Sequence, residues 1–208
     1  SVYEDLNDHE QLRGDLTIQA AVNRTDVLAS SSTLCRFENR SGRQAAWRIH
    51  EVMVEQFVTS FKDVPEELIL DFDATDDAVH DKQEGRSFNG YYDHYCFLPL
   101  YMFCKDQLLV SYLRPSNIDG AKHTWAILSL LVKRFRQTWP QVNIIFRGDS
   151  GFCRHKMLTW CERHNVSYIV GIAQNKRLNA LATPWQKEAE EHFSETNEKV
   201  RRYVELQY

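Results

Sequence analysis

Two aspartates, Asp73 and Asp149, stand where a carboxylate can do chemistry. Asp73 ends the apolar run 68–73, and Asp149 follows the apolar run 142–146 in a turn flanked by Gly148 and Gly151. Ligands of open α/β sheets gather at the carboxyl ends of the strands. If these two runs are neighbouring strands, the two carboxylates meet at that edge of the sheet.

Two carboxylates held close together repel each other unless a cation neutralises them. Mg²⁺ suits such a pair, because it takes oxygen ligands, keeps several waters and binds through few carboxylates together with a phosphate. Two such ions, roughly 3.5–4 Å apart, can activate the attacking oxygen and stabilise the leaving oxygen in phosphoryl transfer. Gly148 and Gly151 are expected to leave room for a backbone or a phosphate. The alternative is that Asp149 and Ser150 only cap the following helix.

The acidic charge of the chain is concentrated in one segment. The net charge is −4, and residues 71–84 hold six acids and one lysine, a local sum of −5 that leaves +1 for the rest. A metal site would concentrate acids in this way, although a solvated acidic turn would do the same.

Three other residues near these acids offer alternatives. Asp71 shares a strand face with Asp73 and could bind the metal in its place. His80 and His94 could instead belong to a hydrolase-type metal site, but their spacing fits no helix or strand pairing, which favours surface or substrate-contacting histidines. The turn around Ser150 lacks a GxSxG elbow, which argues against serine hydrolase chemistry.

The pattern of apolar residues predicts the elements that must position the aspartates. Apolar residues spaced three and four apart predict a helix over 43–61. Residues 30–33 are predicted to form a break and a cap before another short helix. Strands are predicted over 68–73, 95–103, 107–113, 142–146 and 167–172, with Pro99 indicating a bulge or an edge position. Helices are predicted over 121–139 and 154–164, the second ending at Asn165. Residues from 174 onward show weak periodicity and are left unassigned.

This order predicts an α/β fold with a mixed sheet of about five strands flanked by helices. The strands at 95–103 and 107–113 form a hairpin, and helices cross over between the later strands. The domains expected are an N-terminal helical region (1–63) for DNA or partner contacts, a catalytic core (64–175), and an insertion or incomplete C-terminal part (176–208).

Composition and cysteine usage indicate an ordinary globular protein. Apolar residues make up 43% and charged residues 26% of the 208 residues. No run is long enough to span a membrane, and the first residues are unlike a signal peptide. The five cysteines form no CxxC pair, which argues against a disulfide framework or a zinc knuckle and favours the cytoplasm. Because the sequence begins without Met and ends in a strand-like run, we expect a fragment of a longer chain.

Several motifs in order resemble the DDE transposases of bacterial insertion sequences, and the likeness extends through about residue 175. The motifs are YEDLND (3–8), LDFDATDD (70–77), QEG (83–85), FNGYY (88–92), LRPSN (113–117) and RGDSGF (147–152). The resemblance implies an RNase H-like catalytic domain, with Asp73 and Asp149 as the first two members of an acidic triad that binds Mg²⁺ or Mn²⁺, two ions in the complete site. The third member, a glutamate on a helix, is expected beyond Tyr208, so this fragment alone is expected to be inactive. Glu188, Glu190 and Glu191 are available in the tail, but no motif supports them.

By the same resemblance, the protein is expected to cleave and join DNA. Water would attack the phosphodiester at a transposon end, and the freed 3′-OH would then attack target DNA. The implied partners are double-stranded DNA, as transposon ends and target, and a second copy in a homodimer assembled on DNA. The implied location is the bacterial cytoplasm, in association with the nucleoid. Arg154 and Lys156, which open the helix after Asp149, are candidate contacts for DNA phosphates. The alternatives are an RNase H-like nuclease without strand transfer and a non-catalytic DNA-binding remnant.

Overall fold

The computed structural model describes residues 8–79 and 82–207. It divides into two compact units, Ser1–Ser60 and Phe61–Tyr208. Residues 3–7 of the first motif, His80 and Tyr208 lie outside the described residues. Within the described residues, no helix is both long and apolar enough to cross a membrane.

The first unit is helical, as the sequence pattern predicts. It contains α1 (His9–Leu12), α2 (Leu16–Ala21), α3 (Ser31–Arg40) and α4 (Arg43–Ser60). The predicted break and cap is confirmed: Ser30 is the N-cap of α3, and its hydroxyl accepts a hydrogen bond from the Thr33 N–H. The Oε1 atom of Glu10 accepts hydrogen bonds from both the N–H and the hydroxyl of Ser31, which ties α1 to the start of α3. The Ser31 N–H, followed by Arg13, lowers the pKa of Glu10 to about 2.

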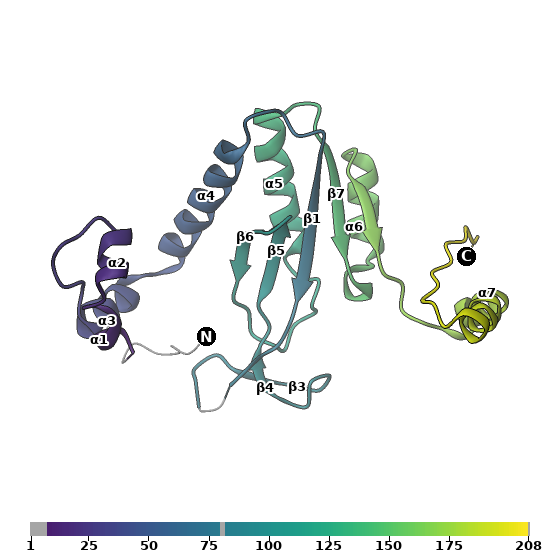
Figure 1. Cartoon of the computed structure of the whole chain (residues 1–208), viewed down its shortest axis with the longest axis horizontal. Coiled ribbons are helices and arrows are strands. Elements are labelled where there is room, and N and C mark those ends of the chain that lie inside the picture. Colours follow the sequence, from purple (N-terminus) through teal and green to yellow (C-terminus); the bar gives the residue numbers. More distant parts are fainter. Residues whose placement is uncertain (1–7, 80–81, 208) are drawn as a thin grey trace. The chain divides into compact units, whose positions relative to one another are not determined.

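The second unit is built on a five-stranded mixed sheet, and the predicted fold class is confirmed. The strand order is β6 (Gln107–Tyr112), β5 (Leu100–Cys104), β1 (Glu67–Ala74), β7 (Asn143–Gly148), β8 (Ser167–Val170). The strands β6, β5 and β1 are antiparallel neighbours, whereas β1, β7 and β8 are parallel. This is the order and direction of an RNase H-like sheet, with the expected hairpin and helical crossovers (Figure 1).

One predicted strand is wrong, because the segment 95–103 is two strands in two sheets. Its first part is β4 (His94–Phe97), which pairs with β2 (Asp77–Ala78) and β3 (Ser87–Asn89) in a separate three-stranded sheet. Its second part is β5, and the chain crosses between the sheets at Leu98 and Pro99. Proline has no N–H for a strand ladder, so the change of sheet falls where the ladder would be interrupted. The bulge in β5 lies instead between Met102 and Phe103.

The core of the second unit lies on one face of the main sheet. Side chains alternate along β1, so Leu68, Leu70 and Phe72 are buried. Neighbouring strands add Met102 and Phe146 to the same apolar layer. The expectation that 95–103 is covered on both faces is wrong for Phe103, which is 37% exposed. Residues of β1 that point to the less covered face, including Asp71 and Asp73, are therefore accessible.

Three helices complete the second unit. The first, α5 (Thr124–Thr138), begins three residues later than predicted, and α6 (His155–Arg163) ends before Asn165, which takes the expected left-handed conformation with φ of 52°. The third, α7 (Lys176–Thr196), lies in the segment that the sequence pattern left unassigned. Its Asn175 N-cap accepts a hydrogen bond from the Leu178 N–H, and Pro184 is tolerated inside it.

Candidate active site

Asp73 and Asp149 lie at the same edge of the sheet, on neighbouring parallel strands. The ladder between β1 and β7 runs from Glu67 opposite Asn143 to Phe72 opposite Gly148, and Asp73 and Asp149 are the next residues on each strand. Both strands end at this edge (Figure 1). The condition under which the two carboxylates meet, that their strands are neighbours, is therefore fulfilled.

The two carboxylates differ in their hydrogen bonds. Asp149 is the N-cap of the short 3-10 turn η1 (Ser150–Phe152), where its Oδ1 accepts a hydrogen bond of 2.8 Å from the Gly151 N–H. The capping role is thus real, but it occupies only one carboxylate oxygen. The Asp73 side chain is exposed and accepts no hydrogen bond from the described residues. Both side chains are exposed at this edge of the sheet, so oxygens of each carboxylate remain accessible.

Asp71, the alternative to Asp73, already has a cation partner. Its carboxylate forms an ion pair with the guanidinium of Arg147, the residue opposite it on β7. The hydrogen bond and charge of Asp71 also raise the pKa of Arg147, so the arginine stays protonated. Between Asp71 and Asp73, Asp73 is therefore the one whose oxygens remain available.

Glycines hold the Asp149 turn in place by letting other atoms come close. A Cβ on Gly148 would lie 2.9 Å from the Phe152 ring, and one on Gly151 would lie 2.9 Å from Asp149 Oδ1. The atoms that come close to these glycines belong to the turn itself, the Phe152 ring and the Asp149 carboxylate. Gly171, which the sequence analysis missed, supports the turn from β8: a Cβ there would lie 2.9 Å from the Ser150 nitrogen, and its N–H donates to Gly148.

The small sheet brings further polar groups toward Asp73. His94 Nε2 lies 2.7 Å from an Asp76 carboxylate oxygen, so this histidine has a carboxylate partner of its own. Burial, followed by the negative charge of Asp76 and, more weakly, of Asp73, raises the pKa of Tyr92. The phenol of Tyr92 therefore stays protonated.

The LRPSN motif forms a structural support beside the site. Arg114 is 1% exposed, and its guanidinium donates to the carbonyl oxygens of Leu98 (2.8 Å), Gly120 (3.0 Å) and Lys122 (2.6 Å). These bonds fold the segment 114–123 so that Gly120 packs against Ala74, next to Asp73. This folding also explains why α5 starts late, since residues 121–123 belong to the loop.

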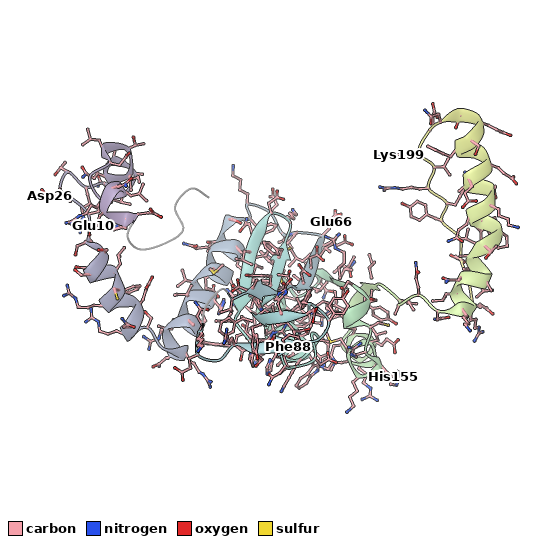
Figure 2. The ribbon with its side chains drawn as sticks, turned by 90° about the horizontal axis from the view of Figure 1, so that it is seen from below. Glu10, Asp26, Glu66, Phe88, His155 and Lys199 are labelled. Carbon is pink, nitrogen blue, oxygen red and sulfur yellow. The ribbon has the colours of Figure 1, made fainter. Side chains whose placement is uncertain are left out.

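The two candidate phosphate contacts lie just after the Asp149 turn. Arg154 Nη2 donates to Asp119 Oδ2 at 3.0 Å, whereas the exposed Lys156 has no partner among the described residues. Burial acts to raise the pKa of Asp119, but hydrogen bonds from the Ala121 N–H and Arg154 outweigh it and lower the pKa. Figure 2 labels His155, which lies between the two basic residues at the start of α6.

No third ligand joins the two aspartates in the described part of the chain, where no group of three or more His, Cys, Asp or Glu side chains could hold a metal ion. Glu188, Glu190 and Glu191 lie on α7, where Glu188 pairs with Arg202 at 3.2 Å. Two carboxylates are nevertheless a suitable donor set for Mg²⁺, which completes its shell with water and substrate phosphates.

Comparison with known proteins gives the following similarities. The catalytic domain of Mos1 mariner transposase shares 11% identity over 79% of this chain and 78% of that one, with a TM-score of 0.36. The Mos1 paired-end complex with the left transposon end shares 10% identity over 90% of this chain and 71% of that one, with a TM-score of 0.34. The Drosophila P element transposase strand transfer complex shares 11% identity over 79% of this chain and 46% of that one, with a TM-score of 0.33. No curated protein matches the chain. The family described as transposase DDE domain group 1 matches residues 1–208, the whole chain, and the protein therefore belongs to this transposase family.

Proposed function

We propose that this protein catalyses metal-dependent DNA cleavage and strand transfer at the ends of an insertion sequence. The observation that carries the proposal is that Asp73 and Asp149 directly follow the last paired residues, Phe72 and Gly148, of the neighbouring parallel strands β1 and β7. Membership of a DDE transposase family supports the same reaction class. The site therefore has the chemistry that metal-assisted phosphoryl transfer needs.

The chain itself binds and orients the reactants. Asp73 and Asp149 would hold Mg²⁺ or Mn²⁺, two ions in the complete site. When bound, these ions lower the barrier by neutralising charge on the attacking and leaving oxygens. The hydrogen bond from Gly151 fixes the Asp149 carboxylate.

DNA is the proposed partner. Lys156 and Arg154, at the start of α6, would contact phosphates of the strand held at Asp149, because phosphate contacts mainly set the position of a duplex. The helical region 1–63 would contact DNA or a second copy, since two transposon ends require a paired assembly. The segment 64–175 would then be the catalytic core of each protomer.

The test compares cleavage and joining of labelled insertion-sequence ends by the wild type, Asp73→Asn and Asp149→Asn. Asparagine keeps an Oδ1 acceptor for the Gly151 N–H, so the turn stays intact while the charge is lost. With the full-length protein, we expect Mn²⁺-dependent cleavage and joined products from the wild type and neither from the variants. Asp106→Asn, in the exposed turn between β5 and β6, is the matched control and should behave as the wild type.

Other outcomes identify the alternatives. Cleavage without joined products would indicate a nuclease on the same fold. DNA binding without cleavage by any form would indicate a non-catalytic remnant. Equal cleavage by the wild type and Asp149→Asn would contradict the two-aspartate mechanism.

A further inference from the structure

The helix α7 carries an apolar stripe along one side. The members of the stripe recur at spacings of three and four, which place them together on a helix: Leu178, Leu181, Ala182, Trp185, Ala189 and Phe193. No side chain of α7 is buried among the described residues, and Trp185 and Phe193 are 41% and 48% exposed. A helix in water owes most of its stability to the packing of such a stripe, so we expect α7 to pack against another element.

The residues that follow α7 do not bury this stripe. Figure 2 shows the stretch from Lys199 onward beside α7, and Arg202 pairs there with Glu188 at 3.2 Å. However, the apolar side chains of Val204 and Leu206 remain exposed themselves. The stripe is therefore accessible to a second chain.

The charges of α7 are arranged against the preference of an isolated helix. Its first turn contains Lys176 and Arg177 but no acid, and its last turn contains no basic residue. The second half of the helix holds its glutamates, Glu188, Glu190, Glu191 and Glu195. The helix dipole favours acids at the N-terminus and bases at the C-terminus. Each end of α7 is therefore complementary to the opposite end of an antiparallel copy of itself.

One pair of opposite charges lies on a single side of α7. Arg177 is the second residue of the helix and Glu195 is the second-last, and the interval of 18 residues between them equals five turns. Their Cα atoms are about 27 Å apart along the helix, so the two side chains cannot meet within one copy. In an antiparallel second copy, Arg177 of each chain lies beside Glu195 of the other. Trp185 then packs against the small Ala189 of the second copy, and a twofold axis repeats each contact.

We propose that α7 binds the α7 of a second copy of this chain as an antiparallel pair that buries the apolar stripe, in the absence of DNA. A parallel pair would place Arg177 beside Arg177 and Glu195 beside Glu195, and these like charges repel. A covering segment from the same chain would use the stripe, but it would not account for opposite charges at equal distances from the two helix ends. The pairing is independent of the catalytic aspartates and of the contacts proposed for the region 1–63.

The test measures sedimentation velocity of the whole protein in EDTA and without DNA. We expect the wild type to form a dimer. Trp185→Glu should raise the dissociation constant of the dimer at least about tenfold, because a buried tryptophan carries much of the binding free energy of an interface. The matched control is Trp125→Glu, which changes an exposed tryptophan on α5 and should sediment as the wild type.

Exchange of charges tests the antiparallel arrangement. Arg177→Glu and Glu195→Arg should each weaken the dimer roughly tenfold, because each variant places like charges side by side at both ends of the pair. The double variant, Arg177→Glu with Glu195→Arg, should restore the dimer. Since the two residues cannot meet within one helix, restoration would come from contact between two copies.

Three results would overturn the proposal. A monomeric wild type would assign the stripe to another segment of the same chain, and a dimer unaffected by Trp185→Glu would place the interface elsewhere. Single charge variants that the double variant does not restore, or that have no effect, would exclude the antiparallel pair. Because neither metal nor DNA is present and no cleavage is measured, these results leave the test of Asp73 and Asp149 unaffected.

Discussion

Asp71 and Asp73 face the same side of β1, yet their surroundings predict opposite consequences of substitution. Asp71→Asn removes an ion pair whose side chains are 49% (Arg147) and 41% (Asp71) exposed. Exposed pairs contribute about 0–1 kcal/mol, so we expect nearly wild-type stability and cleavage. Asp73→Asn should abolish cleavage while leaving the stability unchanged. Cleavage rates and thermal unfolding of both variants check this, and loss of cleavage in Asp71→Asn alone would identify Asp71 as the ligand.

The cysteines should differ sharply in reactivity. Burial raises the pKa of both the Cys104 and the Cys161 thiols to about 11, whereas Cys35 is exposed. Only the thiolate is nucleophilic, and at pH 8 the two buried thiols stay protonated. Iodoacetamide at pH 8 should therefore label Cys35 and spare the other two, as read by peptide mass spectrometry. In denaturant all three should react, and equal labelling of the native protein would contradict this burial.

The turn between β7 and α6 depends on Gly171 at the end of β8. In Gly171→Ala the new methyl group would press on the backbone of Asp149 and Ser150, with 2.9 Å to the Ser150 nitrogen. Backbone cannot rotate away as a flexible side chain can, so the turn must shift. We expect a loss of cleavage of at least about tenfold, since small displacements of catalytic groups cost rate, with circular dichroism unchanged. Gly90→Ala, where nothing lies within 4 Å, is the control, and equal activity of both variants would disprove the supporting role.

Arg114 should be important for stability rather than for catalysis. Arg114→Lys keeps the charge but cannot supply the planar donor set that reaches the three carbonyl oxygens of Leu98, Gly120 and Lys122. Leaving buried acceptors unsatisfied costs about 1–3 kcal/mol each, so the melting temperature should fall by several degrees. The exposed Arg163→Lys on α6 serves as the control and should melt as the wild type. An unchanged melting temperature in Arg114→Lys would show that the segment 114–123 keeps its fold without the hydrogen bonds of Arg114.

The elements that the sequence predicts well are those with strong local signals. The helix α4 and the cap at Ser30 follow from apolar spacing and side-chain chemistry, and β1 and β7 are short apolar runs that end in acids. The site depends on the pairing of β1 with β7, and the sequence alone does not show that these two strands are neighbours. The sequence pattern does not reveal that the segment 95–103 is divided near Pro99 into two strands, because the residues on both sides of Pro99 are apolar.

Long-range contacts explain the other differences. Gly171 is far from Asp149 in sequence, and nothing in its local pattern shows that it supports the Asp149 turn. Gly148 and Gly151 were correctly singled out as close-approach positions, but the atoms that approach them belong to the turn itself. The helix α7 contains Pro184 and mixes polar with apolar residues, so its period is weak.

At the level of the whole molecule, metal binding should be linked to the stability of one unit. Asp73 and Asp149 both belong to Phe61–Tyr208, so a cation that binds them stabilises that unit and not Ser1–Ser60. A ligand present at 100 times its dissociation constant adds about 2.7 kcal/mol to the stability of the folded state. For a unit of this size, that corresponds to a rise in melting temperature of roughly 5 °C or more.

Calorimetry of the whole protein with and without Mn²⁺ measures this linkage without any DNA. The wild type and Asp106→Asn should gain the same increase in melting temperature, whereas Asp73→Asn and Asp149→Asn should gain little. Without metal, the two asparagine variants should melt at or slightly above the wild type, because each removes one of two neighbouring negative charges. An equal Mn²⁺ effect in all four proteins would place the cation elsewhere. A metal effect that disappears only in Asp73→Asn and Asp149→Asn, with cleavage lost in the same two variants, would assign binding and catalysis to one pair of carboxylates.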